Sequence, residues 1–268
     1  MLKVNHWKYV LVLLLIGIGF SCKKKKNSPF KNGEVCPLLS IVNEQGQKVR
    51  DFEYVNGRLI RIYLTEDIES TLEFYYDGDN VLEYMAVKTP EEVEQFTAHF
   101  IYDTKGKISG TTSTLGDYEF MQNEFVYDDN DVIVGVNSKV DLYGQQVELI
   151  SRVEYNGKNV SRVFTSVNGQ PEKLAFNGDF YDDKPQFFPK AYKNVALGFM
   201  GIDNSYFMYF GENNLTNGRF YDELGKVNQS TSIIYDYNKN GLPASSDISV
   251  LNETQTQVKK YSYEFDCN

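Results

Sequence analysis

Histidine, cysteine and tryptophan are scarce in this sequence of 268 residues, and their scarcity excludes several chemistries. One histidine, His6, lies near the N-terminus, and alternation of the neighbouring residues places the other, His99, on the polar face of a strand. The His and Cys clusters that zinc needs are absent. The sequence also lacks a Gly-x-Ser-x-Gly elbow, a phosphate loop and a dinucleotide-binding glycine fingerprint. These absences favour a non-catalytic protein.

Basic charge is also in short supply. The chain has 27 basic and 37 acidic residues, and residues 1–21 contain two lysines and no acid, so the remainder carries a formal net charge of −12. From residue 27 onward, after the run Lys23–Lys26, the formal net charge is −16. Such an acidic body repels phosphate backbones, and we therefore expect no nucleic-acid partner.

The N-terminus has the pattern of an export signal. Lys3 and Lys8 precede the apolar stretch Tyr9–Phe20, which is shorter than the roughly 20 residues that span a bilayer. The pattern predicts a signal peptide over residues 1–21. Because a small residue precedes Cys22, it resembles a bacterial lipoprotein signal, in which Cys22 becomes the lipidated first residue. The alternative is an ordinary signal with a chance cysteine.

Four lysines, Lys23–Lys26, begin the predicted tether, residues 22–33. Beside a lipid they add about 1 kcal/mol per charge through attraction to anionic head groups. Alternatively, they only keep a flexible segment solvated. In lipoproteins of the Bacteroidota type, which this N-terminus resembles, acidic residues after the cysteine mark export to the cell surface. The lysines here favour the periplasmic face of the outer membrane, with the lipid as the contact to the membrane.

Two further cysteines, Cys36 and Cys267, lie at opposite ends of the predicted folded domain, residues 34–268. In an oxidising compartment such a pair is a candidate disulfide. The alternative is two unpaired thiols in terminal strands. If the bridge forms, the first and last strands must be neighbours, which closes the sheet on itself.

The 20 Tyr and 18 Phe favour pleated, half-buried surfaces. Aromatic residues recur every 22 to 29 positions, and most are followed by Asn, Asp or Gly, which suit tight hairpin turns. The anchors of this repeat are Tyr54, Tyr76, Tyr102, Tyr127, Tyr155, Tyr181, Phe210, Tyr237 and Tyr263.

Between these turns the residues alternate between apolar and polar, which is typical of strands. The repeat predicts an all-β, antiparallel up-and-down meander of roughly 15–18 strands. A circular barrel of this size would leave a lumen that side chains could not fill, so we expect a large flattened or partly open barrel-like sheet. The irregular segment Lys184–Ile202 is either a loop that packs into an opening of the sheet or a weakly marked strand pair.

The segments Tyr235–Pro243 and Tyr261–Cys267 resemble an uncharacterised family of gut-bacterial lipoproteins with a porin-like fold, and the tyrosine–aspartate turns resemble YD repeats. The resemblance implies an architecture and an envelope location, but no activity. Alternation alone is neutral about a membrane-spanning pore. A lipid anchor would be redundant for a barrel that spans the membrane, and residues 266–268 are not the aromatic C-terminus that such barrels usually have.

One turn follows the oxygen-ligand template of a calcium loop, with Asp236, Asn238, Asn240, Gly241 and Asp247 at the required positions. The last residue is the shorter acid, only two ligands are charged, and the flanks are strands. A plain hairpin is therefore the better interpretation, and apart from this calcium alternative no cofactor is expected.

The leading functional hypothesis is a non-catalytic cell-envelope lipoprotein with a binding or scaffolding role for a protein or glycan partner. The alternatives are a carboxylate-based glycoside hydrolase or glycan-binding protein, and a membrane-spanning pore. The only tryptophan, Trp7, lies in the signal, so sugar stacking would fall to tyrosines. Tyr143 and Tyr192 are the candidates that we would place outside the packed core.

Overall fold

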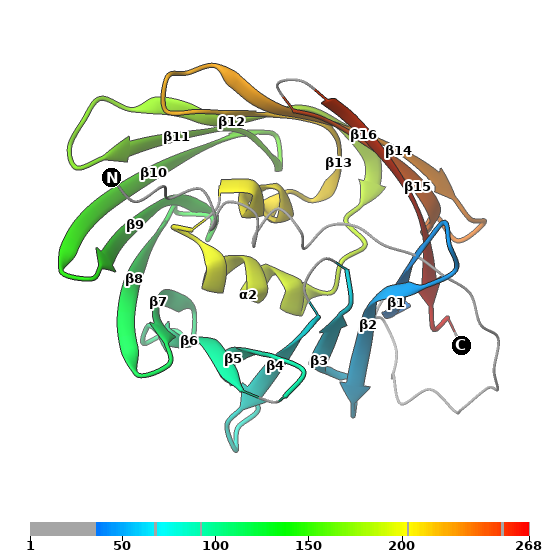
Figure 1. Cartoon of the computed structure of the whole chain (residues 1–268), viewed down its shortest axis with the longest axis horizontal. Helices are drawn as coiled ribbons and strands as arrows, with labels where there is room; N and C mark the ends of the chain where they lie inside the picture. Colours follow the sequence, from blue (N-terminus) through cyan, green and yellow to red (C-terminus); the bar gives the residue numbers. More distant parts are fainter. Residues whose placement is uncertain (1–35, 67–68, 92, 203, 253–254, 268) are drawn as a thin grey trace.

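The computed structural model describes residues 36–66, 69–91, 93–202, 204–252 and 255–267. The predicted signal, the lipidation site Cys22 and the tether lie outside the described residues. The described chain forms sixteen antiparallel strands, each hydrogen-bonded to its neighbours in sequence, and the first strand also pairs with the last (Figure 1). This confirms the all-β meander and its expected number of strands. The result is a closed barrel rather than a partly open sheet.

The strands are 6 to 13 residues long. They are β1 (Leu38–Asn43), β2 (Lys48–Val55), β3 (Arg58–Leu64), β4 (Ser70–Tyr76), β5 (Leu82–Lys88), β6 (Glu94–Tyr102), β7 (Ile108–Leu115), β8 (Tyr118–Tyr127), β9 (Ile133–Leu142), β10 (Gln145–Asn156), β11 (Asn159–Val167), β12 (Lys173–Pro185), β13 (Asn213–Tyr221), β14 (Val227–Tyr237), β15 (Pro243–Asn252) and β16 (Gln255–Phe265).

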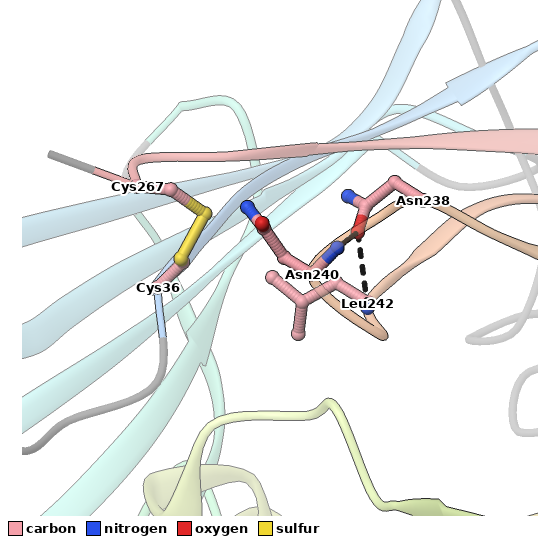
Figure 2. The surroundings of a disulfide bond; sticks show 5 residues. All are labelled: Cys36, Asn238, Asn240, Leu242 and Cys267. Carbon is pink, nitrogen blue, oxygen red and sulfur yellow. Dashed lines mark hydrogen bonds between the residues drawn. A yellow bond between two sulfur atoms is a disulfide. The ribbon is translucent and has the colours of Figure 1, made fainter.

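Closure takes place between β1 and β16, where Ile41 lies opposite Tyr263. Just beyond this pairing, Cys36 and Cys267 form a disulfide with their Cα atoms 4.6 Å apart. The predicted bridge and its consequence for the sheet are both confirmed. Figure 2 shows the β14–β15 turn, with Asn240, beside the disulfide. We call this end of the barrel the disulfide end and the other the open end.

The lumen is filled by the segment between β12 and β13, which contains the helix α2 (Lys190–Phe199) and the 3-10 helix η3 (Asn204–Phe210) (Figure 1). Near the start of α2, Tyr192 contacts Phe52 of β2. Near its end, Phe199 stacks on Phe96 of β6 at 4.9 Å. The helix therefore crosses the lumen from wall to wall. Of the two alternatives for Lys184–Ile202, packing into an opening of the sheet is the correct one, although the segment contains a helix rather than a loop alone. This plug explains how so wide a barrel can close.

The aromatic repeat has a structural basis at the disulfide end. At the end of an even-numbered strand, a tyrosine hydroxyl donates a hydrogen bond of 2.5–3.0 Å to a backbone carbonyl near the start of the preceding strand. Each bond ties the two strands of one hairpin together. The pairs are Tyr54–Leu38, Tyr76–Leu59, Tyr102–Leu82, Tyr127–Ile108, Tyr155–Ile133 and Tyr181–Val160.

Phe210 was aligned with these anchors, and that assignment is wrong. Phe210 ends η3 inside the barrel, because the plug is inserted after β12 and shifts the spacing. The next even-numbered strand ends at Tyr237, whose hydroxyl instead donates to the carboxylate of Asp182 and accepts a bond from Asn214 Nδ2 at 3.1 Å.

On the strands β8 and β9 the inner and outer faces of the wall differ in polarity. Phe125 and Val136 are buried toward the lumen, whereas Glu124 and Lys139 are exposed on the outside. Among the described residues, no helix is both long and apolar enough to cross a bilayer.

Candidate functional site

A cavity of about 490 Å³ opens at the open end, between the plug and the wall from β10 to β13. Two turns form its rim, β11–β12 at Asn168 and β13–β14 at Asp222. Its volume lies within the range of about 300–1,000 Å³ that small-molecule sites occupy. We call it the open-end cavity.

The plug supplies one side of this cavity through Gly201 and Ile202, which follow α2. Gly201 has a φ of +83°, and a Cβ at this position would lie 2.6 Å from Ser138 Oγ of β9. Only glycine combines this backbone conformation with so close an approach to the wall. The end of α2 is held in the same place because Asn123 Nδ2 donates to the Met200 carbonyl at 2.9 Å.

The deeper walls combine apolar side chains with a pair of hydroxyls. Leu149 and Val167 provide apolar surface on adjacent strands. Two residues further along the same strands, Ser151 Oγ and Thr165 Oγ1 lie 3.3 Å apart, and either can donate to the other. One hydroxyl hydrogen and several lone pairs therefore remain for another molecule.

The rim is polar, and much of its polarity holds the turns in shape. Asp222 Oδ1 accepts the backbone N–H groups of Leu224 and Lys226, both at 2.8 Å. Lys173 Nζ donates to the Glu223 carbonyl at 2.7 Å. By contrast, the side-chain amide of Gln170 has no hydrogen-bond partner among the described residues. Gln170 can therefore bind a ligand without releasing a turn.

The plug is fixed on the opposite wall by a buried arginine. Arg50, only 2% exposed, points into the lumen and donates from Nη1 to Tyr192 Oη at 2.7 Å. Burial opposes its charge, but the surrounding tyrosine oxygens, Tyr209 among them, outweigh this and raise the pKa of Arg50. Burial also raises the pKa of Tyr209, which stays neutral. This cluster positions α2 rather than facing a cavity.

This architecture can be compared with known proteins. No protein-family model and no curated protein matches the chain. It is similar to the crystal structure of a porin-like protein from Bacteroides uniformis, with 15% identity and a TM-score of 0.52, covering 85% of this chain and 95% of that one. A porin-like protein from Bacteroides vulgatus gives 12% identity and a TM-score of 0.51, covering 87% and 100%. The chain has a porin-like fold. At these identities the similarity establishes the fold alone.

Two features of this porin-like barrel disfavour a transmembrane pore. First, α2 and η3 occupy the lumen, with Val195 and Ala196 of α2 completely buried. Second, the charged side chains of Glu124, Lys139 and Arg152 are exposed on the outside of β8, β9 and β10, at three different levels of the wall. A spanning barrel presents an apolar band there, and charges near the bilayer midplane are costly.

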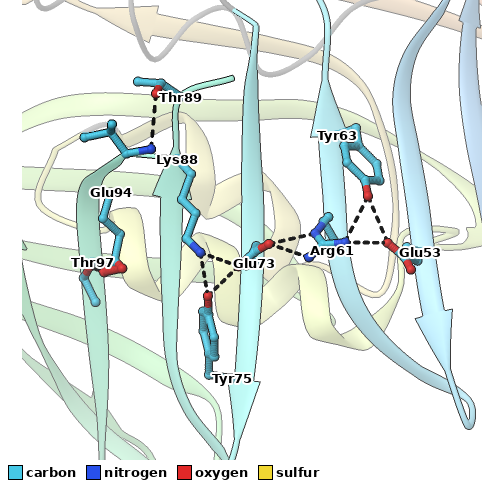
Figure 3. Close-up of polar contacts among 10 residues, drawn as sticks. Glu53, Arg61, Tyr63, Glu73, Tyr75, Lys88, Thr89, Glu94 and Thr97 are labelled. Atoms are coloured by element: carbon cyan, nitrogen blue, oxygen red, sulfur yellow. Dashed lines mark hydrogen bonds and ion pairs between the residues drawn. The ribbon is translucent and has the colours of Figure 1, made fainter. Parts of the chain in front are cut away.

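The outer face of the porin-like barrel carries an ion network from β2 to β5 (Figure 3). Glu73 accepts two bonds from Arg61, at 2.6 and 2.8 Å, and one from Lys88 at 2.8 Å, and it is also bonded to Tyr75. Burial opposes ionisation of Glu73, but the bonds from Lys88, Tyr75 and Arg61 prevail and lower its pKa to about 2. Arg61 also bonds Glu53 at 3.0 Å. Since its charges pair internally, the network clamps strands together.

The tyrosines proposed for stacking lie in different environments. Tyr192 is buried in the plug and is not available to a sugar. Tyr143, on the β9–β10 turn, is 88% exposed, and its ring lies parallel to that of Tyr118 with centroids 5.8 Å apart. His99 is exposed on the outer face, as alternation predicted, where it packs against Tyr84.

The residues of the calcium template make other contacts in this structure. Asn238 Oδ1 accepts the backbone N–H groups of Asn240 and Leu242, at 2.9 and 3.2 Å (Figure 2). Asp236 is exposed on the outside of β14, and Asp247 pairs with Lys260 at 3.3 Å. Within the described ranges, no three His, Cys, Asp or Glu side chains form a group suited to a metal. The same turn, with its side-chain cap, recurs at Asn43, Asp77, Asp103, Asp128 and Asp222.

Sequence reasoning missed the residues of the open-end cavity. None of its lining residues is among the candidate site residues, and the incorrect assignment of Phe210 as an anchor of the repeat leaves the turn after Tyr221 unidentified. A usable signal existed, since Tyr221–Gly225 repeats the tyrosine–aspartate–glycine turn of Tyr102–Gly106.

Proposed function

We propose that this protein is a non-catalytic cell-envelope lipoprotein whose barrel is a ligand-binding module. The observation that carries the proposal is the position of the open-end cavity. It lies at the end of the barrel opposite Cys36, where the described chain begins. A protein tethered through its N-terminus would therefore present the cavity away from its anchor.

The tether length supports this orientation. Cys36 lies 14 positions after Cys22 in the sequence. At 3.3–3.6 Å per extended residue this segment reaches at most about 50 Å, enough to let the barrel stand clear of a membrane while the disulfide end faces it. Because lysines follow Cys22, we place the protein at the periplasmic face of the outer membrane, with the lipid and the basic run as two membrane signals.

Membrane fractionation tests the anchoring part of the proposal. The wild-type protein should sediment with membranes and require detergent for release, whereas the Cys22→Ala variant should be released without it. Retention of that variant in the membrane would contradict lipid anchoring. Protease treatment of intact cells tests the orientation, and loss of the barrel under these conditions would contradict the periplasmic location.

Enzyme assays test the non-catalytic part. We expect no turnover of chromogenic glycosides by the purified protein. Turnover that persists through purification and disappears when one carboxylate is changed, for example in Glu223→Gln, would overturn this part and favour the hydrolase alternative.

A further inference from the structure

We infer that the open-end cavity binds a neutral sugar unit, a monosaccharide or disaccharide such as the end of a glycan chain. This inference rests on the proposed binding function and names the chemical class of the ligand. Three properties of the cavity lead to it: its size, the kinds of groups that line it, and its charge.

The size suits one or two sugar rings. A volume of about 490 Å³ lies in the lower half of the range for small-molecule sites. The cavity is bounded on one side by Gly201 and Ile202 of the plug, so a longer chain cannot continue into the lumen and must extend outward past the rim. This geometry favours recognition of a chain end.

The lining offers both kinds of contact that a sugar ring makes. The side chains of Leu149, Val167 and Pro171 supply apolar surface, on which the C–H face of a pyranose ring can pack. Gln170 at the rim has an unengaged amide with both a donor and an acceptor, and the Ser151–Thr165 hydroxyl pair lies deeper in the cavity. Sugar hydroxyls, which are also donors and acceptors, can satisfy these groups together.

The charge argues against other ligands of the same size. The rim has two carboxylates, Asp222 and Glu223, and one ammonium, Lys173, which is already bonded to a backbone carbonyl. A phosphate or carboxylate ligand would meet a net negative rim. A purely apolar ligand would bury the Gln170 amide without a partner, which costs free energy.

The test is saturation-transfer NMR on the full-length protein in a detergent that contains no sugar. The probes are glucose, galactose, mannose, N-acetylglucosamine, maltose, cellobiose, lactose and diacetylchitobiose. We expect at least one of them to bind with a Kd of about 1 mM or tighter. Absence of binding by all eight at concentrations up to about 10 mM would overturn the inference.

Variants locate the binding. Ala175 also lines the cavity, so the large side chain in Ala175→Trp should fill the cavity and abolish sugar binding. Gln170→Ala and Thr165→Val should each weaken it at least about 10-fold. The matched control is Tyr143→Ala, which removes the most exposed aromatic ring outside the cavity and should leave the Kd unchanged. Because Ala175→Trp adds a large side chain, each variant is first checked by its thermal unfolding, and Gln170→Ala, at an exposed turn, gives the result independent of folding.

If binding is lost in Tyr143→Ala and retained in Ala175→Trp, the sugar binds on the outside of the barrel and the inference is wrong, although a binding function stands. If the Cys22→Ala variant stays in the membrane, the anchoring proposal is wrong, whatever the sugar titrations show. The two failures are therefore distinguishable.

Discussion

Removing the disulfide between Cys36 and Cys267 should strongly destabilise the barrel. The bridge closes a loop with a sequence separation of 231 residues. In the chain-entropy model, a loop of this length restricts the unfolded chain by about 5 kcal/mol at 25 °C. Native contacts at the same seam remain without it, including the hydrogen bond from Ser40 Oγ to Glu264 Oε2 at 2.6 Å. The loss should therefore arise mainly in the unfolded state.

Urea unfolding of the wild type and of the double variant Cys36→Ser/Cys267→Ser measures this effect. We expect the free energy of unfolding to fall by up to about 5 kcal/mol and the m-value to rise, because the unlinked unfolded chain is more expanded. The control is Ser40→Ala, which weakens the seam locally and should cost only about 1 kcal/mol with an unchanged m-value. A loss below about 1 kcal/mol in the double variant would refute the argument.

Three further changes probe other parts of the barrel. Tyr102→Phe removes the hydrogen bond from the tyrosine hydroxyl to the Leu82 carbonyl and should lower the free energy of unfolding in urea by about 1 kcal/mol. The control Tyr84→Phe, whose hydroxyl makes no such bond, should lower it by less than about 0.5 kcal/mol. Equal effects would contradict a structural role for the aromatic repeat. Tyr192→Phe takes the acceptor from a buried guanidinium and should cost about 2 kcal/mol and speed hydrogen exchange in α2; unchanged exchange would count against anchoring of the plug. Because the pKa of Glu73 is lowered to about 2, its contribution to the free energy of unfolding is complete above about pH 4.5 and is lost as the pH falls toward 2. Glu73→Gln should therefore reduce the dependence of the free energy of unfolding on pH between about 4.5 and 2. An unchanged slope in this range would refute the role of the ion network.

The wall of the barrel was predictable because its signals are local. Each turn at the disulfide end needs a residue such as Asp103, whose carboxylate caps two backbone N–H groups. A tyrosine such as Tyr102 lies directly before this residue and ties its strand to the preceding one. The two cysteines at the ends of the domain made closure conditional on a bridge, since a disulfide requires neighbouring strands, whereas the expected sheet was partly open because the helix that fills the lumen was not predicted.

The plug was less predictable because helix α2 lacks local helix signals. Pro189 at its start provides no side-chain cap, and neither end carries charges that favour a helix. Its buried residues, from Tyr192 to Phe199, instead obtain their stability from the surrounding wall. The open-end cavity exists only once this helix lies across the barrel, so no segment of the sequence contains its signal.

Pairing of β1 with β16 also constrains how the protein can be made. These strands lie at opposite ends of the described chain, with Ile41 opposite Tyr263, so the ring cannot be completed before β16 has been synthesised. Until then every growing intermediate has two unpaired strand edges, which are sites for aggregation. An incomplete chain therefore depends on protection by other factors, and nascent copies crowded together would tend to join edge to edge.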